Sequence, residues 1–111
     1  MIVEYIRYTI AEAQRHAFED GYAQAQEALI TSPHWRGHEL AQCVEDPGSY
    51  ILRIEWDSIE GHLQGFRTSP AFRTFFAAIQ PFVTNITEMR HYAVTAIVAA
   101  APKQPPTLPK Q

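Results

Sequence analysis

Apolar and polar positions along the chain predict alternating strands and helices. Residues 2–9 are rich in β-branched and aromatic side chains on both faces, which is typical of a strand covered on both sides. Residues 11–31 carry apolar side chains at helical spacing and predict a helix. Ser32-Pro33 ends this helix, because the residue before a proline avoids the helical region. The face that should pack against the core consists of Phe18, Tyr22, Ala25 and Leu29.

Two alternating segments joined by a tight turn predict a β-hairpin. Residues 37–45 and residues 50–56 each alternate between two faces, and Asp46-Pro47-Gly48 between them is a strong turn sequence. The more apolar face of the second segment consists of Tyr50, Leu52, Ile54 and Trp56.

A second helical region, residues 58–80, is expected in two pieces. Ser69-Pro70 has the pattern of an N-cap followed by proline at the first helical position, and Pro81 ends the second piece. Helical spacing predicts that the first piece has one apolar face formed by Ile59, His62, Leu63 and Phe66. The second piece has an apolar face formed by Phe72, Phe75, Phe76 and Ile79.

A last strand starts at Ile86 and is expected to end near Val94, which completes the order β-α-β-β-α-β. This order predicts an α+β fold of the ferredoxin-like type, with both helices on one face of a four-stranded antiparallel sheet of order 4-1-3-2. Residues 1–98 form the expected domain, and the Ala- and Pro-rich residues 99–111 an extended tail. The uncovered sheet face mixes apolar and charged residues, so a homodimer packed sheet to sheet is the simplest way to cover it.

Composition narrows the function classes. A chain of 111 residues with 46% hydrophobic and 19% charged residues forms one globular domain. A net charge of −3 without a basic cluster argues against a nucleic-acid partner. Only Cys43 is present, which indicates a reducing, cytoplasmic location. The start lacks a signal-peptide pattern, and no apolar run approaches the ~20 residues that span a membrane.

His62 is the first candidate for chemistry, because it stands in the apolar stripe that follows the strand-end Trp56. An imidazole on a buried face is either a hydrogen-bonded core residue or part of a site. Its unperturbed pKa is near 6.5, and burial keeps it neutral. If His62 belongs to a site, its expected role is therefore that of a general base.

Metal and cofactor motifs are not found in the sequence. His34 and His38 are four residues apart but flank a strand start, and no His-Glu-x-x-His, Cys-x-x-Cys or two-His-one-carboxylate spacing occurs. No Gly-x-Gly-x-x-Gly follows a strand, so a Rossmann-type cofactor site is not indicated. The expectation is therefore no metal and no cofactor.

Several segments between Ile2 and Val94 resemble the antibiotic biosynthesis monooxygenase domain family. They are the hairpin end Glu55-Trp56-Asp57-Ser58, the helix with Glu60, His62 and Phe66, the segment from Arg67 to Arg73, and Glu88-Met89-Arg90-His91-Tyr92. The resemblance implies a dimeric α/β barrel. It also implies, as in the cofactor-free members, oxidation of a small phenol-, quinol- or anthrone-like compound by O₂. In the haem-degrading branch the functional asparagine, tryptophan and histidine would fall on Arg7, Phe66 and Phe76, so haem degradation is not expected.

Two hypotheses follow. In the first, the protein is a dimeric, cofactor-independent monooxygenase with His62 as base. Its substrate, a small aromatic compound, would contact Trp56, Phe66, Phe72, Phe76, Tyr50 and His91. In the second, the same fold is a non-catalytic ligand-binding or assembly module, whose aromatic residues are core and whose His91 and Arg90 make interface bonds. An open cavity between helices and sheet, reached by His62, separates the two, because phenylalanines would fill that space in the second.

Overall fold

A computed structural model describes residues 1–102 of the chain. Most of the tail expected over residues 99–111 therefore lies outside the described residues. The strands are β1 (Ile2–Thr9), β2 (Trp35–Gln42), β3 (Ser49–Trp56) and β4 (Ile86–Ala93). The helices are α1 (Arg15–Leu29) and α2 (Pro70–Ile79), with short 3₁₀ segments η1 (Glu12–Gln14) and η3 (Gln80–Asn85) and a π-helix, η2 (Gly61–Phe66).

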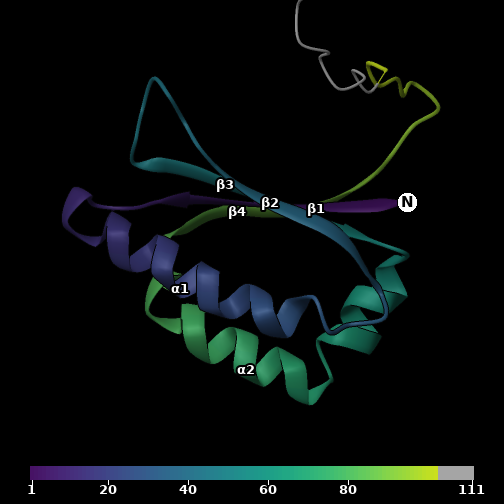
Figure 1. The fold of residues 1–111 in the computed structure, drawn as a ribbon, viewed down its shortest axis with the longest axis horizontal. Helices are drawn as coiled ribbons and strands as arrows, with labels where there is room; N and C mark the ends of the chain where they lie inside the picture. Colours follow the sequence, from purple (N-terminus) through teal and green to yellow (C-terminus); the bar gives the residue numbers. More distant parts are fainter. Residues whose placement is uncertain (103–111) are drawn as a thin grey trace, which may run out of the picture.

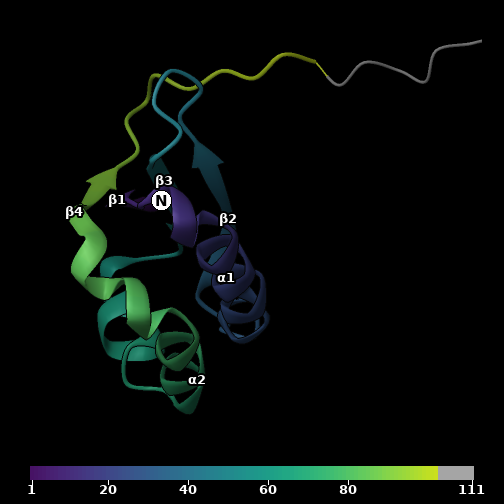
Figure 2. The same cartoon turned by 90° about the vertical axis from the view of Figure 1, so that its left-hand side faces the viewer.

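The predicted fold is confirmed. The four strands form one antiparallel sheet of order β2-β3-β1-β4, which is the expected order read from the other edge. Helices α1 and α2 pack side by side on the same face of this sheet (Figures 1 and 2). The central strand β1 places Glu4 opposite Ile54 of β3 and opposite His91 of β4.

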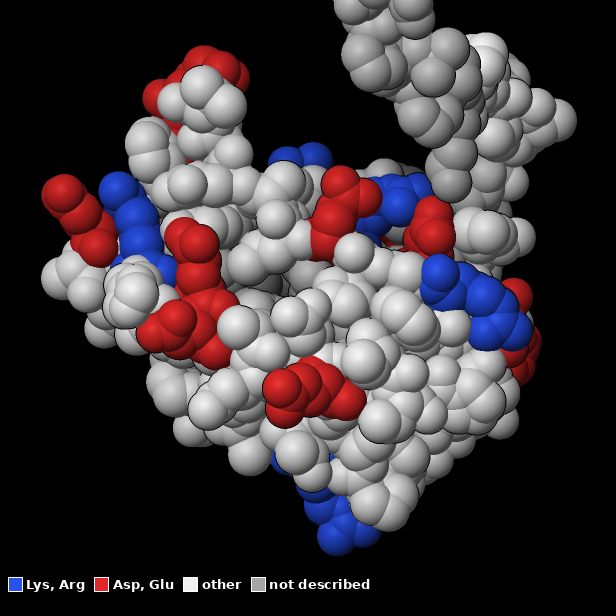
Figure 3. All heavy atoms as spheres, in the orientation of Figure 1, with Lys and Arg blue, Asp and Glu red and all other residues white. Residues whose placement is uncertain are grey.

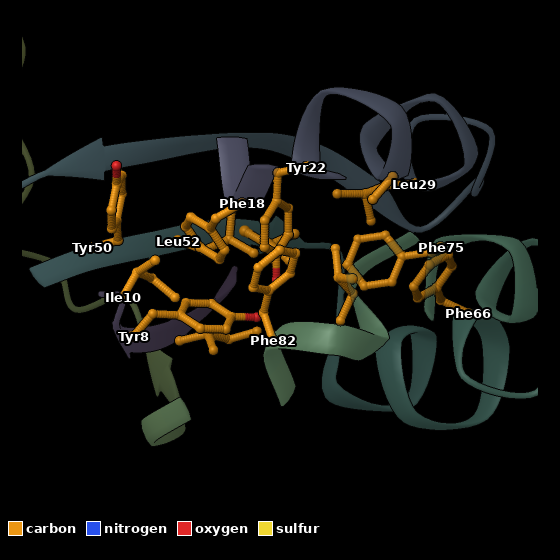
Figure 4. Packing of buried hydrophobic residues seen from close by; sticks show 14 of the residues in the cluster. Tyr8, Ile10, Phe18, Tyr22, Leu29, Tyr50, Leu52, Phe66, Phe75 and Phe82 are labelled. Atoms are coloured by element: carbon orange, nitrogen blue, oxygen red, sulfur yellow. The ribbon is translucent and has the colours of Figure 1, made fainter. Parts of the chain in front are cut away.

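The core lies between the sheet and the two helices and is mostly aromatic (Figure 4). All four residues of the face predicted for α1 are buried, and Phe18, near the start of the helix, contacts the rings of Tyr8, Tyr50 and Phe82. Gly21, on the helix–helix contact, lets α1 approach α2 closely, because a Cβ there would lie 3.0 Å from the Ala78 carbonyl oxygen. Ser69 caps α2 as expected, accepting the Phe72 N–H at 3.3 Å.

The segment between β3 and α2 differs from the prediction. His62 and Phe66 are buried, but Ile59 and Leu63 are 39% and 40% exposed, so they do not share the inner face. The reason is local winding: the Arg67 N–H donates to the His62 carbonyl five residues earlier, at 3.0 Å, and η2 is a π-helix. In this wider turn residues four apart still share a face, but residues three apart, such as Ile59 and His62, no longer do. Single π-turns are frequent at functional sites.

The distribution of charged side chains on the surface agrees with the lack of a basic cluster in the sequence. Figure 3 shows acidic and basic side chains interspersed over one side of the molecule rather than gathered by sign. On the sheet face away from the helices, Arg53 pairs with Glu55 at 2.9 Å and with Glu39 at 3.7 Å. Among residues 1–102, no helix combines the length and the apolar character that crossing a bilayer requires.

Candidate functional site

A cavity of about 220 Å³ lies between the sheet and the helical layer. Its walls are mostly apolar and come from β1, β3, η2, α2, η3, the edge strand β4 and Tyr22 of α1. The polar side chains that reach it include Glu4, His62 and Arg67. An apolar cavity with few polar groups is the usual form of a small-molecule site.

The structure brings most of the predicted site residues to this cavity. Five of them line it: Trp56, His62, Phe66, Phe72 and Phe76. Tyr50 does not, because it lies at the opposite end of the core from Phe66 (Figure 4) and its hydroxyl donates to Glu19 at 2.6 Å. His91 does not line the cavity either, but its Nε2 contacts Nδ1 of His62, which does.

Glu4 is the site residue that sequence reasoning missed. It lies on the inner face of β1 and is 2% exposed. The Trp56 indole N–H donates to its Oε1 at 3.2 Å, and His62 Nε2 lies 3.5 Å from the same oxygen. A signal existed, since a lone carboxyl shared a strand face with Ile2, Ile6 and Tyr8. It could not be used, because large side chains on both faces left the inner face of this strand unassigned.

The imidazole ring of His62 is contacted at both of its nitrogens and on one of its faces. Its ring stacks on Trp56, with centroids 4.5 Å apart and planes 13° apart. Its Nδ1 lies 2.7 Å from Nε2 of His91, while its Nε2 faces Glu4. Glu4, His62 and His91 thus form a continuous chain, named here the Glu4–His62–His91 chain, that starts in the cavity and ends on the edge strand β4.

Burial sets the protonation of this chain. Desolvation raises the pKa of Glu4 to about 7, and the hydrogen bond from Trp56 and the charge of Arg67 offset this only in part. Desolvation lowers the pKa of His62 to about 3, helped by the charges of His91 and Arg67. The pKa of His91 is lowered by burial and then by Arg67. Near pH 7 both imidazoles are therefore neutral, and Glu4 exchanges between its acid and carboxylate forms.

Arg67 is the second residue that sequence reasoning did not assign to the site. It follows directly after η2, and its guanidinium carbon lies 5.8 Å from the centroid of the Phe72 ring. It lines the cavity while remaining exposed, and its charge lowers the pKa of Glu4. A cation at this position favours a negative charge on a bound molecule.

The same chain contains two imidazoles and one carboxyl, a donor set that can bind iron in other proteins. One donor atom from each of Glu4, His62 and His91 lies within 4.8 Å of the others. Linear spacing could not reveal this group, because its members come from β1, η2 and β4. However, His62 turns a different nitrogen toward each partner, so the atoms that actually make the contacts do not converge on one point. The arrangement suits proton transfer better than metal binding.

Comparisons with known proteins agree with the fold and the resemblance. The sequence model of the family Antibiotic biosynthesis monooxygenase matches residues 1–78. The uncharacterized protein YczJ of Bacillus subtilis (strain 168) is 29% identical over 92 residues, which cover 83% of this chain and 97% of YczJ.

Two solved structures illustrate the likeness in fold. A Bordetella bronchiseptica protein assigned to the same family superposes with a TM-score of 0.71 at 23% identity, covering 85% of this chain and 96% of that one. SnoaB, a cofactor-independent oxygenase from Streptomyces nogalater, superposes with a TM-score of 0.66 at 19% identity, covering 92% and 97%.

Proposed function

The chain belongs to the antibiotic biosynthesis monooxygenase family, and from this premise we propose that it oxidises a small phenolic or quinol-like compound with O₂ and without a bound cofactor. The observation that carries the proposal is the carboxyl of Glu4, buried beside His62 in an apolar cavity. The fold shared with SnoaB, a cofactor-independent oxygenase, is consistent with it.

Glu4 is the base in this proposal. A general base works best when its pKa lies near the working pH, and burial raises the pKa of Glu4 to about 7. His62, the base expected from the sequence, has its pKa lowered to about 3 and is a weak proton acceptor at neutral pH. We therefore assign proton removal from the substrate hydroxyl to Glu4, and assign to His62 the positioning of the Glu4 carboxyl.

Arg67 stabilises the anion that results. Its guanidinium at the cavity wall offsets the negative charge of a phenolate, and the apolar walls keep water away. The electron-rich anion then reduces O₂ directly. One oxygen atom enters the ring and the other leaves as water, with all four electrons supplied by the substrate, so that a phenol gives the corresponding quinone.

The cavity size favours a substrate of one ring. A dry apolar cavity of ~150 Å³ accepts benzene, and most drug-sized ligands need roughly 300 Å³ or more. At about 220 Å³, this cavity has room for a substituted phenol or hydroquinone. Phe66 and Phe72 supply flat walls for such a ring.

The alternative hypothesis, a non-catalytic ligand-binding or assembly module, predicts that phenylalanine side chains fill the cavity. Phe75 is buried in the core, while Phe76 is 38% exposed, and space remains between them and the sheet. This observation supports a site that takes a ligand.

We also propose a homodimer through the sheet face that α1 and α2 leave uncovered. That face carries Tyr92, 46% exposed, edge-to-face with Tyr5, beside the Arg53 ion pairs. Aromatic and arginine side chains of this kind are enriched at protein interfaces.

The direct test is turnover of a panel of single-ring phenols, hydroquinones and catechols together with anthrones, after chelator treatment and removal of bound small molecules. We expect O₂-dependent turnover of single-ring compounds and none under anaerobic conditions. Binding without turnover across the panel would favour the non-catalytic module. Turnover restricted to anthrones would contradict the argument from cavity size.

A further inference from the structure

Glu4 takes up the hydroxyl proton of the substrate, and the oxygen atom that later leaves as water takes a proton back, so Glu4 exchanges protons within each turnover although the net reaction releases none. With 2% of its surface exposed, it cannot pass this proton directly to bulk water. We propose that His91 is the outlet, and that the proton travels from Glu4 through His62 to His91 and then to solvent along the Glu4–His62–His91 chain. This inference rests on the proposed oxidation, because it concerns the protons that the base exchanges during that reaction.

The contacts along the chain have the order that such a transfer needs. Glu4 Oε1 lies 3.5 Å from His62 Nε2, and His62 Nδ1 lies 2.7 Å from His91 Nε2. His62 can therefore accept a proton on one nitrogen while it releases another from the opposite nitrogen. The O–H bond of Glu4 and the Nδ1–H bond of His62 break, and N–H bonds form at His62 Nε2 and His91 Nε2. His62 changes tautomer and stays neutral, while His91 becomes an imidazolium until it releases a proton to solvent. The reverse transfer, which brings back the proton that the leaving oxygen needs to form water, restores the starting tautomer of His62.

Trp56 keeps the chain aligned. Its indole N–H fixes Glu4 at 3.2 Å, and its ring stacks on His62 with planes 13° apart. A ring that is stacked on one face and engaged at both nitrogens has little freedom to turn. One side chain thus holds both the donor and the acceptor of the first transfer.

His91 is suited to the outlet by its place in the sheet. It belongs to the edge strand β4, shares the inner face with its register partner Glu4, and is only partly buried. Among the groups near the chain, Arg67 carries a positive charge that acts on both His62 and His91. This charge disfavours a proton that stays on either imidazole, so it favours release to water.

Two substitutions at His91 separate proton transfer from positioning. In His91→Gln the amide group stands near the position of Nε2 and can keep the hydrogen bond to His62, but it cannot carry a proton. In His91→Ala both functions are lost. We expect both variants to lower kcat at least tenfold with KM within about twofold, and added imidazole to restore the rate of His91→Ala. The matched control is His16→Ala, an exposed histidine on α1, which should leave kcat unchanged.

Several results would overturn the inference. Wild-type kcat in His91→Gln would mean that His91 only positions His62, and a fully active His91→Ala would remove any role. The ¹⁵N spectra of the imidazoles give a readout that needs no substrate. We expect His62 Nδ1 and His91 Nε2 to share a proton, and independent tautomers would exclude the chain. Absence of turnover in the wild type together with a shared proton would instead contradict the proposed oxidation.

Discussion

The indole N–H of Trp56 donates to the carboxyl oxygen of Glu4 at 3.2 Å, across the pairing of β3 with β1. This bond lowers the pKa of a carboxyl that burial otherwise raises. Because the bond favours the carboxylate over the acid, it tunes the base as well as holding it.

Trp56→Phe should therefore move the pKa of Glu4 upward from about 7, because the ring remains while the donor is lost. The pH at which kcat/KM reaches half its maximum should rise with it, since this profile reports the free enzyme's base. A profile unchanged in Trp56→Phe would show that Glu4 is not the group that titrates.

Stability should respond to pH through Glu4 in a defined direction. Its pKa is raised from 4.5 in the unfolded chain to about 7 in the fold, so between these values the folded protein holds the proton more tightly. The contribution of Glu4 to stability is full below pH 4.5 and is lost as the pH rises to about 7, by on the order of 3 kcal/mol.

Glu4→Gln should lack that loss. His62 acts oppositely in both proteins, because its lowered pKa, about 3, removes stability as the pH falls from 6.5. Urea unfolding between pH 4 and 8 gives the free energy of unfolding of each protein. The value for the wild type minus the value for Glu4→Gln should fall as the pH rises. A difference that is flat or rises with pH would contradict the raised pKa of Glu4.

His62→Ala should harm both stability and turnover. The imidazole is buried, stacks on Trp56 and contacts Glu4 and His91, so its loss opens a cavity and should cost roughly 1–3 kcal/mol. Turnover should fall by about 10²–10⁴-fold, the usual effect of removing an acid–base group. Melting and turnover measured on one preparation separate the two effects, and a stable, fully active variant would reject both roles.

The proposed dimer is tested by mass in solution. Covering the free sheet face should bury at least ~1,200 Å² in total, enough for a specific interface. Light scattering at micromolar concentration should therefore give twice the 12.6 kDa mass of the chain. A monomer under these conditions would exclude a stable dimer through this face.

Periodic patterns in the sequence predicted most of the fold. The buried face of α1, the alternation of β3 and the Ser69 cap followed from spacing, because each depends on the chain's own repeat. The π-turn did not follow from spacing. In the fold the His34 ring packs where a Cβ of Gly61 or Gly65 would stand, which is a tertiary contact. Helical spacing alone cannot report such a contact.

Only part of the candidate site could be predicted from the sequence, because the rest depends on tertiary contacts. Trp56, His62 and Phe66 stand close together in the sequence and were found from it. His91 was predicted as a substrate contact, but its contact with His62 was not, and Glu4 was missed. The strand pairing of β1 with β4 sets Glu4 opposite His91. That register brings together residues far apart in the chain, and no local pattern specifies it.

The most direct test of the account is O₂ uptake by Glu4→Gln and by the wild type with the same single-ring phenol, after removal of metals and cofactors. Wild-type uptake should rise through pH 7. Uptake by Glu4→Gln should be lower by at least ~100-fold, with substrate affinity little changed. Equal uptake by the two proteins would contradict the assignment of Glu4 as base.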